Sequence, residues 1–258
     1  MKKLILLSLI TLLCLPLTVY AAGIGGPPTG GQFKFNIGLD QDVVSDRDLK
    51  PSNIVVMMPL DVAVTCDIKK MYRSMLNVSF GVFDFLDVYV KLGVADYKFK
   101  ADLINNFGFP LGDATLNSKW GFAYGGGLKG AYMFKDGPVK GLIIGADAQY
   151  LRHKQRYHAM IDSLMGPDDF TGKATFQEWQ FGPFVGYKIM KFIPYVGVKY
   201  SDVRLRIRTD EDTYKFKAED HFGTFVGLTY DILPQLKLNL EGRFIDETGL
   251  NLNVIFRF

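Results

Sequence analysis

The sequence predicts an all-β chain that closes into a transmembrane antiparallel up-and-down β-barrel of about ten strands, with eight or twelve as alternatives. Three observations predict this fold. Apolar and polar residues alternate over long segments, the segments run to about 10–15 residues, and long connections alternate with short ones. Strands of soluble proteins average about 5–6 residues, whereas a tilted strand needs about 9–11 residues to cross a bilayer.

The composition excludes several other classes of protein. Of the 258 residues, 48% are hydrophobic and 14% are aromatic, which is too many for a disordered chain. Lys and Arg number 30 against 27 Asp and Glu, and two of these cations lie in the N-terminal leader. Because the rest of the chain is nearly neutral, we expect no nucleic-acid partner.

The N-terminus has the pattern of an export signal. Lys2 and Lys3 precede an apolar run over residues 4–15, and small residues stand at the positions that a signal peptidase reads before residue 22. The run is too short for a retained membrane helix. We therefore expect a cleaved signal peptide over residues 1–21, a flexible periplasmic lead-in over 22–32 and an outer-membrane barrel over 33–258.

The C-terminal segment shows the strand pattern most clearly. Every second residue from Leu250 to Phe258 is apolar, whereas Asn251, Asn253 and Arg257 lie between them. Such alternation gives a strand one apolar and one polar face. The expected strands cover residues 33–43, 71–83, 86–97, 120–134, 141–153, 175–189, 193–207, 221–233, 235–245 and 249–258.

The connections differ systematically in length. Those after odd-numbered strands span about 27, 22, 21, 13 and 3 residues, while those after even-numbered strands are tight turns. Outer-membrane barrels have long external loops and short periplasmic turns. The apolar stretch over residues 53–59 is unusual for a loop; it could extend the first hairpin, contact a partner or add a further hairpin.

Aromatic residues mark the ends of two expected strands. Trp120 and Tyr132 stand about 12 residues apart, which corresponds to roughly 30 Å for a tilted strand. Trp179 and Tyr187 repeat the arrangement. This spacing is typical of an apolar band bounded by two aromatic girdles.

With its leader, alternating strands and terminal Asn253-Val-Ile-Phe-Arg-Phe258, the chain resembles small bacterial outer-membrane β-barrel proteins, the class that includes opacity-like and OmpA-like barrels. The resemblance implies residence in the bacterial outer membrane, among its lipid and lipopolysaccharide. It also implies that Phe256 and Phe258 form the signal read by the barrel assembly machinery.

A ten-stranded barrel has a narrow bore, because eight strands leave just enough interior for side chains to fill. The polar faces of the expected strands carry charges of both signs, which should pair across the lumen rather than form a selectivity ring. The candidates for lining the lumen are Arg73, Lys91, Lys129, Asp147, Glu178, Lys199, Arg204, Arg206, Arg208, Glu241 and Arg243.

Three of these candidates form a separate group. Arg204, Arg206 and Arg208 occupy alternate positions, but with the opposite parity to the polar residues before them. We expect a bulge near residues 201–202 to account for the change. These arginines could bind an anion, face lipopolysaccharide or form salt bridges with the acidic segment at 210–220.

The sequence supports no catalytic, metal or cofactor site. The His residues are His153, His158 and His221, and none stands in a recognisable pattern with carboxylates, Ser or Cys. A structural, adhesive or surface-loop role is therefore the leading hypothesis, with an unidentified surface ligand. A narrow channel for small polar solutes or anions is the second, and a barrel enzyme, such as an omptin-like protease or a lipid-modifying enzyme, is a distant third.

Overall fold

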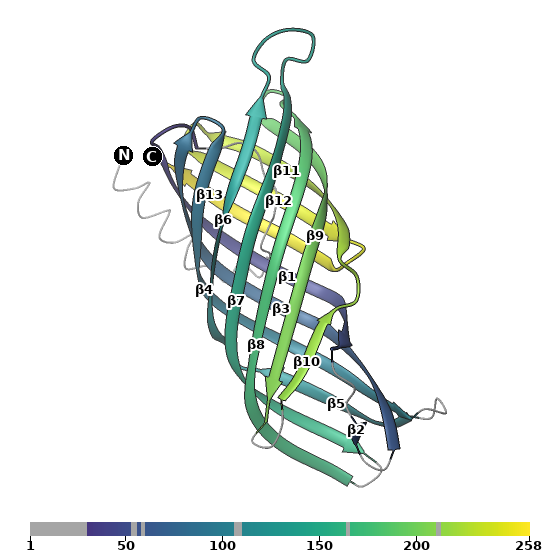
Figure 1. Ribbon diagram of the computed structural model, residues 1–258. Helices are drawn as coiled ribbons and strands as arrows, with labels where there is room; N and C mark the ends of the chain where they lie inside the picture. The colour runs from purple at the N-terminus through teal and green to yellow at the C-terminus, as the bar shows by residue number, and fades with distance from the viewer. Residues whose placement is uncertain (1–29, 53–55, 58–59, 106–109, 164–165, 210–212) are drawn as a thin grey trace.

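The computed structural model describes residues 30–52, 56–57, 60–105, 110–163, 166–209 and 213–258 (Figure 1). The expected signal peptide and most of the lead-in lie outside these residues. The described chain forms one 13-stranded antiparallel sheet. Within the described ranges, no helix is long and apolar enough to span a membrane.

Every pairing between the strands is antiparallel. The strands are β1 (Phe35–Pro51), β2 (Val56–Met57), β3 (Leu60–Phe83), β4 (Leu86–Asn105), β5 (Pro110–Ser118), β6 (Gly121–Met133), β7 (Leu142–Ser163), β8 (Gly166–Tyr187), β9 (Phe192–Arg208), β10 (Thr213–Ala218), β11 (Phe222–Leu233), β12 (Leu236–Phe244) and β13 (Thr248–Arg257).

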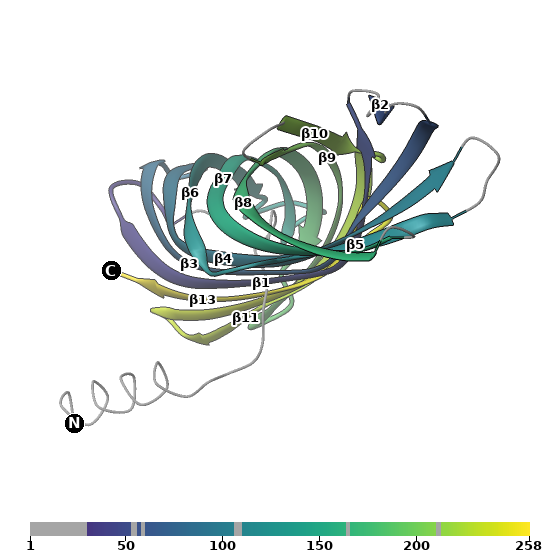
Figure 2. The ribbon, with the colours of Figure 1, turned by 90° about the horizontal axis from the view of Figure 1, so that it is seen from below.

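Ten of these strands close into a ring, as the sequence predicts. The order around the ring is β1, β3, β4, β6, β7, β8, β9, β11, β12 and β13, and β13 pairs back onto β1. Figure 2 shows the closed outline from one end. Closure leaves no unpaired sheet edge around this ring, which a membrane-spanning sheet requires.

The ring narrows toward one end of the barrel. There β5 takes the place of β6 between β4 and β7. The short strand β10 pairs with β9 on one side and β1 on the other, beyond the ends of β11, β12 and β13. This part of the barrel, which we call the long-hairpin end, therefore has eight strands: β1, β3, β4, β5, β7, β8, β9 and β10. The opposite part, with its tight connections, is the short-turn end.

The long connections expected from the sequence are mostly strand. The β7–β8 hairpin is paired from Leu142↔Tyr187 to Ser163↔Gly166, where a loop of about 21 residues was expected. The pattern misleads because side chains at this end reverse their polarity, with apolar residues inside and charged residues outside. In the 53–59 stretch, β2 pairs with β3, and the remaining residues lie outside the described ones.

The outer surface around the middle of the barrel is apolar. Val90, Leu128 and Phe181 are each about half exposed on it. The expected aromatic residues also point outward: Trp120 and Trp179 lie toward the long-hairpin end, and Tyr132 and Tyr187 toward the short-turn end. The exterior thus carries an apolar band bounded by aromatic side chains.

Strand β9 corrects the expectation of a bulge. Its side chains alternate between buried and exposed without interruption from Phe192 to Arg208, so the expected bulge near 201–202 is absent from this described strand. Val198 and Arg206 lie on the same outward face, while Lys199 and Leu205 both point inward. The strand keeps its register. What changes along it is its surroundings, because the interior turns from polar to apolar and the exterior from apolar to charged.

Candidate functional site

The barrel interior is filled in layers. An apolar plug, which includes Phe99, Tyr157, Phe176, Leu205 and Phe216, occupies the long-hairpin end. A smaller apolar cluster lies toward the short-turn end. Between the two lies a layer of charged side chains that crosses the barrel.

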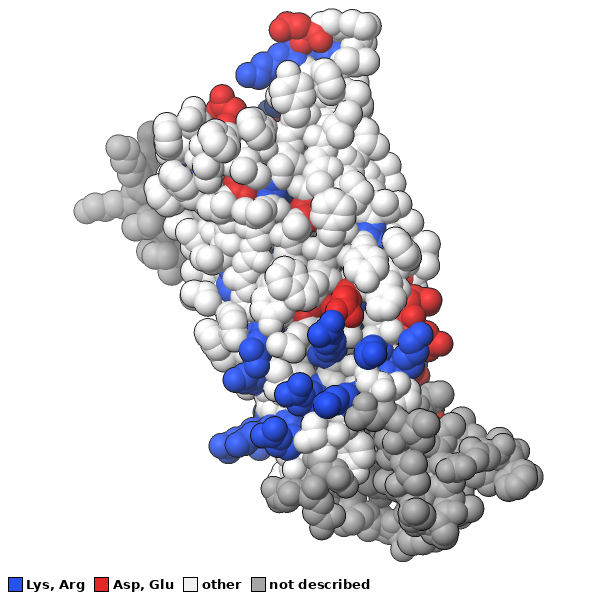
Figure 3. All heavy atoms as spheres, viewed as in Figure 1, with Lys and Arg blue, Asp and Glu red and all other residues white. Residues whose placement is uncertain are grey.

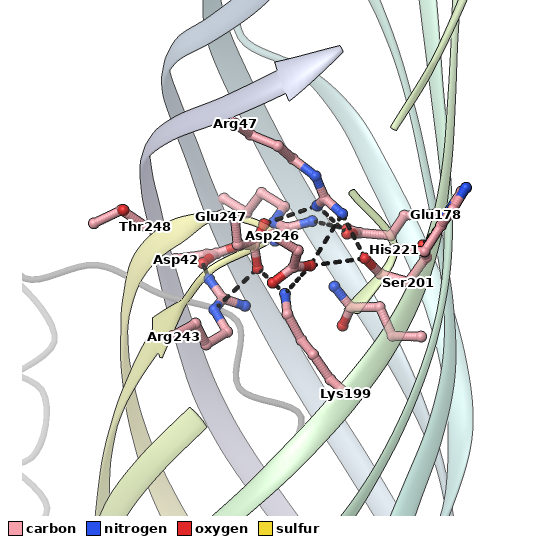
Figure 4. Close-up of polar contacts among 12 residues, drawn as sticks. Asp42, Arg47, Glu178, Lys199, Ser201, His221, Arg243, Asp246, Glu247 and Thr248 are labelled. Carbon is pink, nitrogen blue, oxygen red and sulfur yellow. Dashed lines mark hydrogen bonds and ion pairs between the residues drawn. The ribbon is translucent and has the colours of Figure 1, made fainter. Parts of the chain in front are cut away.

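We call this layer the polar network, and Figure 4 shows its contacts. Every charged side chain in it is fully buried. The cations and carboxylates balance, four of each. The network comprises Asp42, Arg47, Arg73, Glu178, Lys199, Arg243, Asp246 and Glu247.

Arg47 of β1 lies at its centre. Its Nη1 is 2.5 Å from Glu178 Oε1 on β8 and 2.7 Å from Glu247 Oε2. Its Nη2 donates to Ser201 Oγ at 2.7 Å and lies 3.5 Å from Asp246 Oδ2. One guanidinium thereby joins strands from different sides of the barrel.

Arg73 and Arg243 share the carboxylate of Asp42. Arg73 also pairs through Nη1 with Glu178 Oε2 at 2.7 Å, so Glu178 bridges two arginines. Breaking a buried pair by removing one partner typically costs about 3–5 kcal/mol, because the other charge stays buried without compensation. The network therefore fixes the strands that supply it.

The turn between β12 and β13 supplies two of the carboxylates. Ile245 has a φ of 83° and is 72% exposed, while Asp246 and Glu247 point into the barrel. A positive φ is rare for a β-branched residue, and such strain persists only where the surroundings impose it. The next residue, Asp246, is held inside the barrel by Lys199, whose Nζ lies 2.9 Å from Asp246 Oδ2.

Glycine makes room for this turn. A Cβ on Gly223 of β11 would lie 1.9 Å from Asp246 Oδ1 and 2.9 Å from Lys199 Cε. Any side chain there would collide with the carboxylate. The inward position of Asp246 thus depends on the absence of a side chain on the neighbouring strand.

Further polar contacts continue toward the short-turn end. Lys91 Nζ lies 2.8 Å from Asp40 Oδ2, and the Tyr89 hydroxyl donates to Asp147 Oδ1 at 2.6 Å. The Tyr195 hydroxyl lies 2.9 Å from Glu241 Oε2. The interior charges therefore pair across strands at several levels.

The structure places the predicted lumen residues in two groups. Lys129 lies opposite the inward-facing Asp147 on the neighbouring strand. Arg204, Arg206 and Arg208 are exposed on the outer face, contrary to expectation, because the alternation of β9 continues unbroken. The buried candidates in the interior are Arg73, Lys91, Asp147, Glu178, Lys199, Glu241 and Arg243.

His153 and His221 have partners other than the charged residues of the polar network. His153 is buried, with its ring 4.6 Å from that of Phe176 and 5.7 Å from that of Tyr97. His221 Nδ1 contacts the Ser201 carbonyl oxygen at 2.9 Å rather than Asp220. No group of metal ligands forms among the described residues. The network's carboxylates all face cations, an arrangement suited to holding strands together.

The outer surface of the long-hairpin end carries a second feature, which we call the basic face. It covers β7, β8, β9 and β10, and Figure 3 shows its Lys and Arg gathered on the side of the barrel that faces the viewer. Its side chains point away from the apolar plug. The basic face consists of Arg152, Lys154, Arg156, Lys173, Arg204, Arg206, Arg208, Lys215 and Lys217.

A family model described as "outer membrane protein beta-barrel domain" matches residues 84–257. A comparison with curated proteins finds no match. The fold is similar to that of the outer membrane protease OmpT from Escherichia coli, at 12% identity and a TM-score of 0.48, over 87% of this chain and 94% of that one.

Two further solved structures show similarity. The toluene transporter TbuX from Ralstonia pickettii matches at 11% identity and a TM-score of 0.36, over 89% of this chain and 90% of that one. The outer membrane protein OprG from Pseudomonas aeruginosa matches at 10% identity and a TM-score of 0.32, over 90% and 99%. These likenesses concern the fold alone.

Proposed function

Because the chain belongs to the family of outer membrane β-barrel domains and resides in the bacterial outer membrane, we propose that it is a closed barrel with a structural or surface-loop role. In this role the membrane-spanning ring anchors the protein. The eight-stranded long-hairpin end forms a rigid extension that carries the hairpin tips on the cell surface.

The filled interior is the observation that carries the proposal. The polar network crosses the barrel from β1 to β8 through Arg47 and Glu178, and the apolar plug occupies the next level toward the long-hairpin end. An ion would need a continuous hydrated path, and two consecutive layers of buried side chains oppose one.

The polarity of the long-hairpin end supports its placement outside the membrane. Its interior is apolar and its outward positions on β7 and β9 carry Lys and Arg, as in a water-soluble barrel. A charged residue facing hydrocarbon costs about 2–4 kcal/mol at the bilayer midplane. This section is therefore suited to the aqueous surface rather than to the lipid.

Conductance measurements test the closed barrel. Purified protein reconstituted into a planar bilayer should give no steady current steps, while a water-filled porin reconstituted in the same way should give them. A strain that lacks the protein should also take up small hydrophilic antibiotics at the wild-type rate. Steady steps from the folded wild-type barrel would reject the closed state in favour of a narrow channel.

The alternatives have weaker support. Arg204, Arg206 and Arg208 would have been the basis of an anion-selective lumen, but they lie on the outside. An enzyme would need a reactive group with a free partner, whereas Glu178 and Glu247 are each held by two cations or more. We therefore propose a role without catalysis.

A further inference from the structure

The basic face brings like charges together across neighbouring strands. Lys173 of β8 lies directly opposite Arg156 on β7 and Arg208 on β9. On β9 and β10, Arg206 lies opposite Lys215. The same holds for Arg204 and Lys217, and for Lys217 and Lys50 of β1.

Such pairs are unfavourable on their own. Directly opposed residues on a sheet have Cβ atoms about 4.5–5.5 Å apart, and like charges at this distance destabilise the sheet. Among the described residues, the carboxylate that pairs with the basic face is Asp202, 3.0 Å from Arg204 at its lower edge. The other cations lack a protein counter-charge in the described chain.

The opposite side of the barrel is different. There Lys69 of β3 pairs with Asp46 and Asp67, each at 3.1 Å, and Lys100 of β4 lies 3.4 Å from Asp102. Lys69 and Lys100 thus have carboxylate partners on the chain, and one opposed pair of cations, Lys70 and Lys98, lies on this side. The basic face carries several such opposed pairs at one height of the barrel.

That height is the boundary of the apolar band. A groove of about 640 Å³ runs across the basic face, from Trp120, which precedes β6, to Arg206 and Arg208 on β9. Arg156 and Lys173 line it between these ends. Next to the groove, on the side of the short-turn end, Trp179 and Phe122 are 60% exposed. A ligand in the groove would therefore meet cations toward the long-hairpin end and an apolar surface toward the short-turn end.

We propose that the basic face binds the phosphorylated saccharide head group of an outer-leaflet glycolipid, the lipopolysaccharide, whose acyl chains lie along the apolar band. Phosphate oxygens would accept hydrogen bonds from the arginines and would relieve the repulsion between opposed cations. The proposal rests on the outward placement of the long-hairpin end. It does not depend on whether the barrel is closed.

The basic face also replaces divalent cations in this arrangement. Neighbouring glycolipid phosphates repel one another unless cations lie between them, and here the strands supply fixed cations in a row. Bound glycolipid should therefore remain on the protein when Mg²⁺ and Ca²⁺ are removed with a chelator.

Binding of a defined glycolipid tests the proposal. The wild-type barrel in detergent is titrated with bis-phosphorylated lipid A and with its dephosphorylated form, in the presence of a chelator. The same titration uses Arg156→Gln/Lys173→Gln/Arg208→Gln and a control, Lys69→Gln/Lys98→Gln/Lys100→Gln, on the opposite side. At about fivefold per basic residue, the first variant should bind about 100-fold more weakly than wild type.

The control variant should bind the phosphorylated lipid as tightly as wild type does. Wild type should bind the dephosphorylated lipid about as weakly as the first variant binds the phosphorylated lipid. Equal binding by all three proteins would overturn the proposal. Displacement of the lipid by millimolar inorganic phosphate would also overturn it, since free phosphate would then be the ligand. Because titration in detergent needs no conductance and no orientation, its result is independent of the test of the closed barrel.

A single substitution gives a second readout that folding defects cannot mimic. Lys173→Gln removes the cation opposed on both sides, so it should raise the unfolding midpoint in detergent alone. With lipid A present it should reduce the rise in midpoint that the ligand causes in wild type. A lower midpoint without ligand, or an unchanged ligand effect, would contradict the proposed site.

Discussion

Arg47 on β1 and Glu178 on β8 form an ion pair, Nη1 to Oε1 at 2.5 Å, between strands on opposite sides of the ten-stranded ring. Five steps separate β1 from β8 in either direction around the ring: β3, β4, β6, β7 and β8 one way, β13, β12, β11, β9 and β8 the other. The pair therefore spans the lumen. It links β1 to β8 across the interior at the level where the ring changes from ten strands to eight.

Loss of Glu178 should destabilise the barrel strongly. Glu178→Gln leaves Arg47 and Arg73 each with one carboxylate fewer, and the expected loss is about 3–5 kcal/mol in the free energy of unfolding. The control is Asp102→Asn, which breaks a half-exposed pair with Lys100 and should cost about 1 kcal/mol or less. Urea unfolding in lipid vesicles measures both. Similar losses for the two variants would mean that the network does not hold the strands.

A side chain at Gly223 should displace the β12–β13 turn. Gly223→Ala puts a Cβ into the space of the Asp246 carboxylate, and separating it from Lys199 should cost about 3–5 kcal/mol, as for a broken buried pair. Gly130→Ala is the matched control, because its Cβ would lie 3.7 Å from the Phe85 carbonyl oxygen, an ordinary contact distance. The same unfolding assay compares them, and equal stability would show that the turn has room to move.

Outward positions in the apolar band and in the long-hairpin end should differ in their tolerance of charge. Val198 is 54% exposed in the apolar band, so Val198→Arg should lose about 2–4 kcal/mol by placing a cation against lipid. Asn117→Arg, exposed on β5 in the long-hairpin end, should change stability by less than about 0.5 kcal/mol. The order of the two losses in vesicles checks where the lipid boundary lies, and the reverse order would invalidate it.

Cysteine labelling should separate the two ends of the barrel. Lys50→Cys is exposed at the long-hairpin end, and Asp136→Cys is exposed in the turn between β6 and β7. On intact cells an impermeant maleimide should label the first and spare the second. The native Cys66 is 1% exposed and should contribute little background. Labelling of Asp136→Cys alone would invert the proposed orientation.

Removal of Phe258 should impair insertion of the barrel. The Phe258 amide donates to the Phe35 carbonyl oxygen at 2.9 Å, and its ring packs against Phe256 at 4.9 Å between centroids. Both contacts lie at the seam between β13 and β1. We expect the truncated chain to be exported but to give little of the folded, heat-modifiable form on gels, whereas Phe258→Tyr should give normal amounts. A normal amount of folded truncated chain would assign the assembly signal elsewhere.

Strand β9 shows how far alternation carries the prediction. It located the strand and the inward position of Lys199, because a buried charge among apolar neighbours stands out. It failed for Arg204, since the pattern was read as though one face always meets lipid. Beyond the apolar band the outward face of β9 becomes charged and its inward face becomes apolar. In the sequence, this exchange of polarity between the two faces looks like a shift of register by one residue.

The inward turn at Asp246 and Glu247 was also missed, although a charge count points to it. In the polar network the four cations Arg47, Arg73, Lys199 and Arg243 meet only two carboxylates from strands, Asp42 and Glu178. Asp246 and Glu247 supply the two missing carboxylates. Their direction depends on the positive φ of Ile245 and on the space at Gly223, and neither can be read from periodicity.

The narrowing of the ring has a consequence for the order of assembly. Strand β10 meets β1 through three residue pairs, Leu49↔Ala218 to Pro51↔Phe216, whereas β13 meets β1 over ten. Because the longer seam brings β1 beside the β9–β10 hairpin, we expect the shorter seam to form after the last strand has docked. An intact β10–β1 seam would then indicate a molecule whose ten-stranded ring is complete.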